Sequence, residues 1–96
     1  MWARVATFQG GDPERMQDEI ERRLREPGGF PDEMKGLLVL ADREENRRVF
    51  VALLESRAAL EQAEPGFNRM RDEIPEEVRG QRTSLEYYEV VAQHMT

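Results

Sequence analysis

The stretch from Lys35 to Ser56, KGLLVLADREENRRVFVALLES, decides the fold. It holds two short apolar runs, residues 35–41 and 47–54, and the polar segment 42–46 lies between them. Apolar runs of this length joined by a few polar residues are typical of two antiparallel strands and their connection. We therefore predict a β-hairpin in the middle of the chain.

Upstream of this hairpin, the sequence predicts a strand and then a helix. Residues 2–9 mix aromatic and β-branched side chains and end at a pair of glycines, which is typical of a strand. Asp12 can cap the N–H groups of a helix that begins at Pro13. The helix ends at residues 27–29, Pro-Gly-Gly. Its apolar stripe consists of Met16, Ile20 and Leu24.

Downstream of the hairpin, a second helix and a last strand are predicted. Ser56 is the expected N-cap of the helix. Pro65 and Gly66 interrupt the helical pattern, and a proline inside a helix removes a hydrogen bond, so we expect a kink or a break there. Residues 75–80 form a loop, and residues 83–91 form the last strand before a tail to Thr96. The apolar positions of the helix are Leu60, Ala63, Phe67, Met70 and Ile74.

The element order is therefore β-α-β-β-α-β, the order of the ferredoxin-like α+β fold. Right-handed crossovers place both helices on one face of a four-stranded antiparallel sheet. The chain has 96 residues, which is enough for one domain, and we expect residues 1–96 to form it.

Both faces of the central strand 47–54 are apolar, and two helices can cover only one of them. An antiparallel sheet with a solvated face should alternate apolar and polar residues, so the second face needs a cover. A second copy of the chain is the expected cover, because closed homodimers are the commonest oligomers. Burial under another protein is the alternative. One face carries Val49, Val51 and Leu53, and the other carries Phe50, Ala52 and Leu54.

Composition excludes several classes of function. The net charge is −6, which disfavours nucleic-acid partners and anionic membrane surfaces. There is no cysteine, so disulfides, thiolate metal sites and cysteine nucleophiles are excluded, and a reducing compartment, the cytoplasm, is expected. No apolar run reaches the roughly 20 residues that a membrane span requires. Residues 1–4 do not begin a signal peptide.

Four segments resemble the antibiotic-biosynthesis-monooxygenase-type family of dimeric α+β barrels. They are WARVATFQG at 2–10, KGLLVLADR at 35–43, LLES at 53–56 followed by AAL at 58–60, and SLEYYEV at 84–90. The resemblance covers nearly the whole chain. It implies a dimer in which two sheets face each other, with a pocket between sheet and helices in each subunit. Some members oxygenate aromatic polyketide-like substrates without metal or flavin, and others degrade haem.

The residues of the haem-degrading branch are missing. Its pattern has an asparagine in the first strand, a tryptophan just before the second helix and a histidine on that helix. The matching positions here are Ala3 and Leu54, and the second helix contains no histidine. The quinone-forming members use Trp, Asn and Tyr groups in the pocket, whereas Trp2, the sole tryptophan, lies at the chain start. The resemblance thus implies no cofactor.

We expect a mainly apolar pocket between the sheet and the second helix, suited to a flat aromatic or apolar small molecule. Its position follows from side chains that share a face, and the alternative is that they close into a solid core. One of two adjacent tyrosines should line it, because neighbours on a strand point to opposite faces. The expected contributors are Val5, Thr7, Phe50, Leu54, Phe67, Asn68, Met70, Arg71 and either Tyr87 or Tyr88.

The remaining candidates and the choice between functions stay open at this stage. His94, the only histidine, is either a general base or axial ligand, or a residue of a loose tail. No spacing for a metal site accompanies it. The sequence is compatible with a cofactor-independent monooxygenase, or with a non-catalytic small-molecule binder or structural homodimer on the same scaffold. Oxygen consumption with an aromatic substrate distinguishes an oxygenase from a binder.

Overall fold

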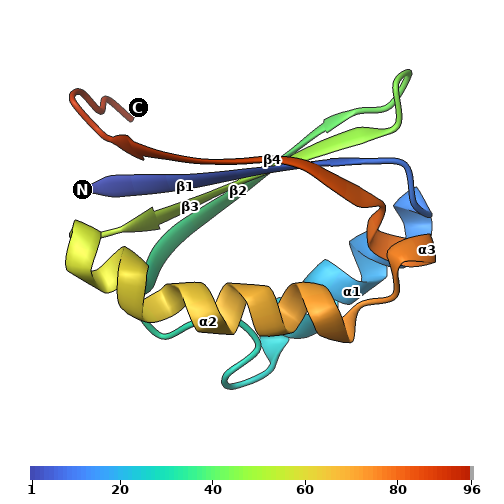
Figure 1. The fold of residues 1–96 in the computed structure, drawn as a ribbon, viewed down its shortest axis with the longest axis horizontal. Coiled ribbons are helices and arrows are strands. Elements are labelled where there is room, and N and C mark those ends of the chain that lie inside the picture. The colour runs from blue at the N-terminus through green and yellow to red at the C-terminus, as the bar shows by residue number, and fades with distance from the viewer. Residues whose placement is uncertain (96) are drawn as a thin grey trace.

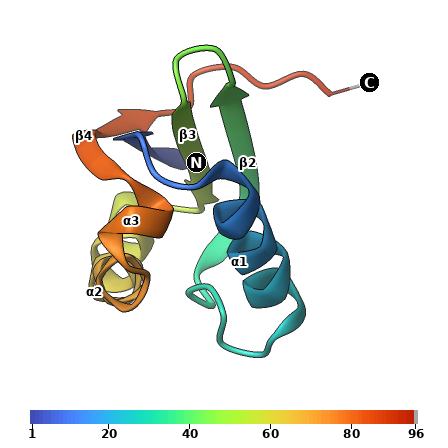
Figure 2. The same ribbon diagram turned by 90° about the vertical axis from the view of Figure 1, so that its right-hand side faces the viewer.

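The computed structural model describes residues 1–95 and confirms the ferredoxin-like α+β fold. All strand pairs are antiparallel, and the order across the sheet is β2-β3-β1-β4. Helices α1 and α2 lie on the same face of the sheet, and the other face is open (Figures 1 and 2). The elements are β1 (Trp2–Gln9), α1 (Pro13–Arg25), β2 (Met34–Asp42), β3 (Arg47–Leu54), α2 (Arg57–Glu73), α3 (Glu76–Arg79) and β4 (Gln81–Glu89).

Helix α1 begins as its sequence predicts and buries a short stripe. The Asp12 side chain accepts a hydrogen bond from the Arg15 N–H at 3.1 Å, which satisfies one free donor of the first turn. Met16 and Ile20 are buried. Leu24, predicted on the same stripe, is 58 % exposed, because the apolar cluster that α1 joins ends at Ile20.

Helix α2 is one continuous helix over residues 57–73. A kink or a break was predicted at Pro65-Gly66, and the break is wrong. Pro65 lies on the exposed side, whereas Ala63 and Phe67 on either side of it are buried. Packing of this apolar face stabilises the helix and outweighs the hydrogen bond that the proline removes. At its start, the Ser56 hydroxyl accepts from the Ala59 N–H at 3.0 Å.

The two faces of the sheet follow from the strand register. In the β1–β3 pair, Ala6 lies opposite Phe50, and both face the helices. Val5 lies opposite Val51 on the open face. Leu38 is 53 % exposed on that face, which confirms that the sheet presents apolar side chains on both sides.

The buried side chains form two clusters under the sheet rather than one. The first gathers at the start of α2 and the second at the contact of α1, the end of α2 and α3, with Phe50 packed at its edge. The first cluster contains Ala52, Leu54, Leu60, Ala63 and Phe67. The second contains Met16, Ile20, Ile74 and Val78. A cavity lies between them.

One corner of the fold differs from the predicted loop at 75–80. It contains the short helix α3, and β4 begins at Gln81 rather than at Thr83. The turn after β1 packs tightly on this corner. Gly11 has a φ of +88°, and a Cβ there would lie 2.5 Å from the Val78 carbonyl oxygen, so no larger residue fits.

No helix within residues 1–95 is long and apolar enough to cross a membrane.

Candidate functional site

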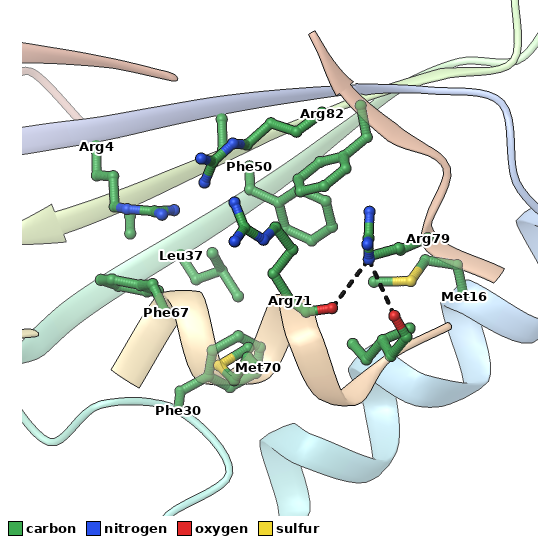
Figure 3. A pocket seen from close by; sticks show the side chains of 14 residues that line it. Arg4, Met16, Phe30, Leu37, Phe50, Phe67, Met70, Arg71, Arg79 and Arg82 are labelled. Carbon is green, nitrogen blue, oxygen red and sulfur yellow. Dashed lines mark hydrogen bonds between the residues drawn. The ribbon is translucent and has the colours of Figure 1, made fainter. Parts of the chain in front are cut away.

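A cavity of about 60 Å³ lies between the sheet and α2, and Met16 of α1 and Arg79 of α3 line it at one end (Figure 3). By the same measure one water needs roughly 10–15 Å³, so the space holds a few water molecules. Its apolar wall is formed by Ala6, Phe8, Met16, Phe30, Leu37, Phe50, Ala52, Phe67, Met70 and Ile74. Its polar wall consists of Arg4, Arg71, Arg79 and Arg82. No acidic side chain of residues 1–95 lines it.

Four of the predicted pocket residues meet at this cavity: Phe50 from β3 and Phe67, Met70 and Arg71 from α2. Phe50 also packs edge-on against Phe8 at 5.6 Å between ring centroids, which fixes the wall on the sheet side. The contributions of β3 and α2 could thus be read from strand alternation and helical spacing.

Two predicted residues lie next to the cavity without lining it. Leu54 faces the helices but is fully buried in the first core cluster. Asn68 lies behind the wall, where its Oδ1 accepts a hydrogen bond from Arg82 at 3.5 Å. Leu54 therefore supports the site by packing, and Asn68 supports it by holding an arginine.

The prediction that Val5 and Thr7 line the cavity is corrected by the register. They pair with Val51 and Val49 on the open face, whereas Phe50 is on the helix face. A shift of one residue exchanges the faces of a whole strand, and the sequence of β1 does not reveal which set of positions faces the helices.

The choice between the two tyrosines is also resolved by the register. Tyr87 lies opposite Arg4 on the helix side, next to Glu64 and beside the cavity rather than in its wall. Tyr88 lies on the open face, and its hydroxyl donates to Glu86 at 2.6 Å. Burial and then the charge of Glu64 raise the pKa of Tyr87 above its ordinary value.

Arg4 is held at the cavity by a buried ion pair. Its Nε and Nη2 donate to the two carboxylate oxygens of Glu64 at 2.9 and 3.0 Å, and its guanidinium lies 4.4 Å from the ring centroid of Phe67. Arg4 is only 6 % exposed. Burial alone would raise the pKa of Glu64, but the hydrogen bonds and charge of Arg4, with smaller effects of Tyr87 and Arg82, lower it.

Arg82 has a weaker set of partners than Arg4. Within residues 1–95, its only side-chain hydrogen bond goes to Asn68, and no carboxylate lies within 4 Å of it. Burial and the nearby charges of Arg71 and Arg4 lower the pKa of the Arg82 guanidinium. Arg71 pairs with Asp72 at 3.1 Å, but that carboxylate is largely exposed, which weakens the pair.

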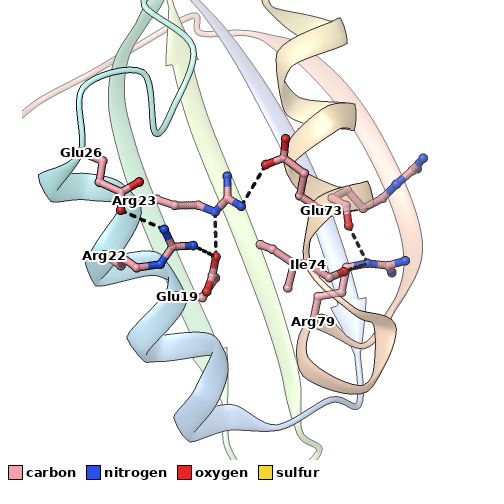
Figure 4. Close-up of polar contacts among 8 residues, drawn as sticks. Glu19, Arg22, Arg23, Glu26, Glu73, Ile74 and Arg79 are labelled. Carbon is pink, nitrogen blue, oxygen red and sulfur yellow. Dashed lines mark hydrogen bonds and ion pairs between the residues drawn. The ribbon is translucent and has the colours of Figure 1, made fainter.

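Arg79 closes the cavity by binding backbone carbonyls (Figure 4). Its Nε donates to the carbonyl oxygens of Arg71 and Ile74 at 2.9 and 3.0 Å, at the C-terminal end of α2. A cation there satisfies free carbonyls and complements the helix dipole. The buried Arg48 acts similarly, because it donates to the Gly10 carbonyl at 2.9 Å. Both have structural roles in this geometry.

An ion pair joins α1 to α2 (Figure 4). Arg23 donates to Glu19 at 3.1 Å on its own helix and to Glu73 of α2 at 3.2 Å. Arg22 bridges Glu19 and Glu26. Arg22 and Arg23 of α1 are thus paired with carboxylates, unlike Arg82.

Sequence reasoning missed Arg4, Arg79 and Arg82. In β1 part of the signal was present: Arg4 alternates with the apolar Ala6 and Phe8, and a charge on an otherwise apolar face is a candidate functional group once the register shows that this face meets the helices. His94 lies exposed after β4, away from the cavity. Within residues 1–95 no group of histidine and acidic side chains is arranged to hold a metal ion.

Solved structures share this fold over nearly the whole chain. Rv0793 from Mycobacterium tuberculosis is 14 % identical with a TM-score of 0.67, and 98 % of each chain is covered. A proposed antibiotic biosynthesis monooxygenase from Chloroflexus aurantiacus is 7 % identical with a TM-score of 0.63, over 98 % of this chain and 96 % of that one. A variant of SnoaB, a cofactor-independent oxygenase from Streptomyces nogalater, is 17 % identical with a TM-score of 0.60, over 96 % and 94 %.

These comparisons confirm at the level of the fold the resemblance read from the sequence. The fold of the chain is similar to that of a proposed antibiotic biosynthesis monooxygenase and of a cofactor-independent oxygenase. No protein-family model matches the sequence, and a search of curated proteins finds no match. At these identities the likeness carries the fold alone, so the function has to be argued from the cavity.

Proposed function

We propose that this protein is a cofactor-independent monooxygenase that acts on an apolar aromatic small molecule. The observation that carries the proposal is the apolar cavity between sheet and helices, lined on one side by arginines. The fold that it shares with a cofactor-independent oxygenase supports the same reading. Pockets that are mostly apolar with a few convergent polar groups are typical small-molecule sites.

The proposed reaction needs no electrons from a cofactor. A methylene group between aromatic rings loses a proton to water to give a delocalised carbanion, which reduces O2, and the proton returns when the second oxygen leaves as water. The methylene becomes a carbonyl that holds one oxygen atom, and the other oxygen leaves as water, so the substrate supplies all four electrons. Cationic groups such as Arg4 and Arg82 would stabilise the anion, and the apolar wall would exclude water.

A multi-ring substrate needs more room than the cavity of about 60 Å³ provides. Phe30 and Met70 are the wall residues placed to give way, because both are only partly buried, whereas Ala52 and Phe67 belong to the core. We therefore propose that substrate enters between the loop that carries Phe30 and helix α2.

Oxygen consumption with a dihydroxyanthrone tests the proposed activity. We expect uptake of one O2 per quinone formed, and Met70→Trp should reduce the rate at least tenfold by filling the entrance. Leu24→Trp adds the same bulk at an exposed site on α1 and should leave the rate unchanged. If the substrate binds but no O2 is consumed above the rate in buffer, the oxygenase proposal is wrong.

That outcome would favour the second candidate, a non-catalytic binder of small molecules. One observation supports it: within residues 1–95 the cavity wall contains no carboxylate and no histidine, the usual general bases. Saturable binding without turnover is then expected.

We also propose that the open face of the sheet is covered by a second copy of the chain. Leu38, Leu40 and Tyr88 are each more than half exposed there, and Val51 lies between them on β3. A stable interface buries about 800 Å² per partner, and an apolar sheet face is a suitable source of that area. Facing two such sheets gives the dimeric α+β barrel.

The mass in solution tests the dimer. Light scattering at tens of micromolar should give twice the chain mass, and Leu38→Glu should give a folded monomer, because residue 38 is exposed in the single chain. Leu24→Glu is the matched control, since that leucine is equally exposed but lies on α1. A monomeric parent protein, or equal effects of the two variants, would contradict the proposal.

A further inference from the structure

The distribution of charge in this protein is uneven. The chain has 20 acidic and 14 basic residues, yet the cavity wall holds four arginines and, within residues 1–95, no acid. Leaving a partly buried cation without a counter-charge is costly, so a chain selected for stability alone would place a carboxylate beside Arg82, as it does beside Arg4 and Arg71. This protein does place a carboxylate between cations on α1, where Glu19 pairs with Arg22 and Arg23.

The four arginines differ in what they can offer a ligand. Arg79 is bound to three backbone carbonyls, and Arg4 is bound to Glu64. Arg82 makes one long hydrogen bond to Asn68, and Arg71 is paired only with the exposed Asp72. Arg71 and Arg82 therefore keep N–H donors available on the cavity side.

The guanidinium groups of Arg4, Arg71 and Arg82 point toward one another above the rings of the wall (Figure 3). Glu64 neutralises Arg4 and the exposed Asp72 partly screens Arg71, but Arg82 has no carboxylate among residues 1–95 within 4 Å and is repelled by both arginines. The repulsion is relieved when an anion enters between them. The cavity is thus electrostatically prepared for negative charge at one wall and for an apolar body at the other.

We propose that the ligand of this cavity carries a carboxylate on an aromatic ring, and that Arg82 and Arg71 bind the carboxylate. Guanidinium groups bind carboxylates in bidentate geometry, and this wall offers two of them with free donors. The ring lies against Phe50 and Phe67. The inference rests on the proposed function for the identity of the site, but not on whether the site is catalytic.

Binding of paired probes tests the charge requirement. 1-Naphthoate and the neutral 1-naphthalenemethanol have the same ring, so the ratio of their dissociation constants reports the contribution of charge. We expect naphthoate to bind at least tenfold more tightly, because hydrogen bonds between two charged groups are the strong ones. The preference should shrink in high salt, and 1-naphthyl phosphate is the probe that distinguishes a phosphate ligand from a carboxylate.

Arg82→Met is the decisive variant, because it keeps the length of the side chain and removes the charge. It should remove most of the preference for naphthoate, measured as the ratio of the two dissociation constants. The exposed Arg25→Gln on α1 is the matched control and should bind both probes as the parent does. A thermal melt of the same samples establishes that Arg82→Met is folded.

The outcomes separate this inference from the oxygenase proposal. Equal affinities for naphthoate and naphthalenemethanol, or an unchanged ratio in Arg82→Met, would overturn the inference even if oxygen is consumed with a neutral substrate. Tighter phosphate than carboxylate binding would overturn the choice of a carboxylate. A clear naphthoate preference without any oxygen uptake would support the inference and contradict the oxygenase.

Discussion

Replacement of Glu64 by glutamine isolates the buried ion pair beside the cavity. The variant keeps the size of the side chain but leaves Arg4, whose side chain is 7 % exposed, without its counter-charge and close to Arg82. Removing one partner of a fully buried pair costs about 3–5 kcal/mol. Glu64 is 20 % exposed and the amide oxygen can still accept one hydrogen bond, so we expect a loss of about 2 kcal/mol.

Urea and thermal unfolding at neutral pH measure this loss. For a chain of this size, the melting temperature should fall by roughly 10 °C. Glu61→Gln, one turn earlier on α2, is the matched control, because Glu61 and Arg57 are exposed and 3.4 Å apart. An exposed pair contributes about 0–1 kcal/mol, so that variant should unfold almost like the parent. Equal losses in the two variants would refute the reasoning.

The pH dependence of the stability difference between the parent protein and Glu64→Gln gives a second check. The folded-state pKa of Glu64 is lowered below its ordinary value of 4.5, so its contribution to the free energy of unfolding is complete above pH 4.5. It is lost as the pH falls through the folded-state pKa, where parent and variant both carry a neutral side chain. The gap between their stabilities should therefore close in acid, and a gap that stays constant down to acid unfolding would contradict the assignment.

Two further substitutions and one control test the close packing around Gly11 and the cost in stability of placing Arg82 in the cavity wall. Gly11→Ala should destabilise the fold by more than about 2 kcal/mol in urea unfolding, because its Cβ would clash with the Val78 carbonyl. Gly10→Ala, with a similar positive φ but open space around it, should cost only about 1 kcal/mol. Arg82→Met should raise the free energy of unfolding by about 0.5–2 kcal/mol, since it removes an unpaired cation, and a drop would contradict the electrostatic account.

The fold could be predicted because its local signals agree with one another. Ser56 and Asp12 cap helices where their hydroxyl and carboxylate suggest, and the hairpin 35–54 has the predicted partners. Pro65 shows where such reasoning fails. A proline inside a helix does cost stability, but the packing of the neighbouring Ala63 and Phe67 on the sheet keeps α2 continuous. Such packing cannot be read from a short stretch of sequence.

The site was predicted only in the elements whose faces could be assigned. Alternation within β3 and helical spacing in α2 bring Phe50 and Phe67 to the cavity. For β1 the pairing register decides, and it depends on contacts with strands that are distant in the sequence. Val5 was therefore placed on the wrong face, and Arg4, its neighbour, was overlooked although it lines the wall.

The contrast between the partners of Arg4 and those of Arg82 is the strongest structural support for an anionic ligand. Both side chains reach the same cavity, but the chain provides a carboxylate for one and only an amide for the other. Acidic residues are abundant in this sequence, so the absence of any acidic side chain of residues 1–95 from this wall is not a consequence of composition. A group kept at a cost in stability is expected where function requires it. Tighter folding and weaker naphthoate binding in Arg82→Met would thus have one physical cause.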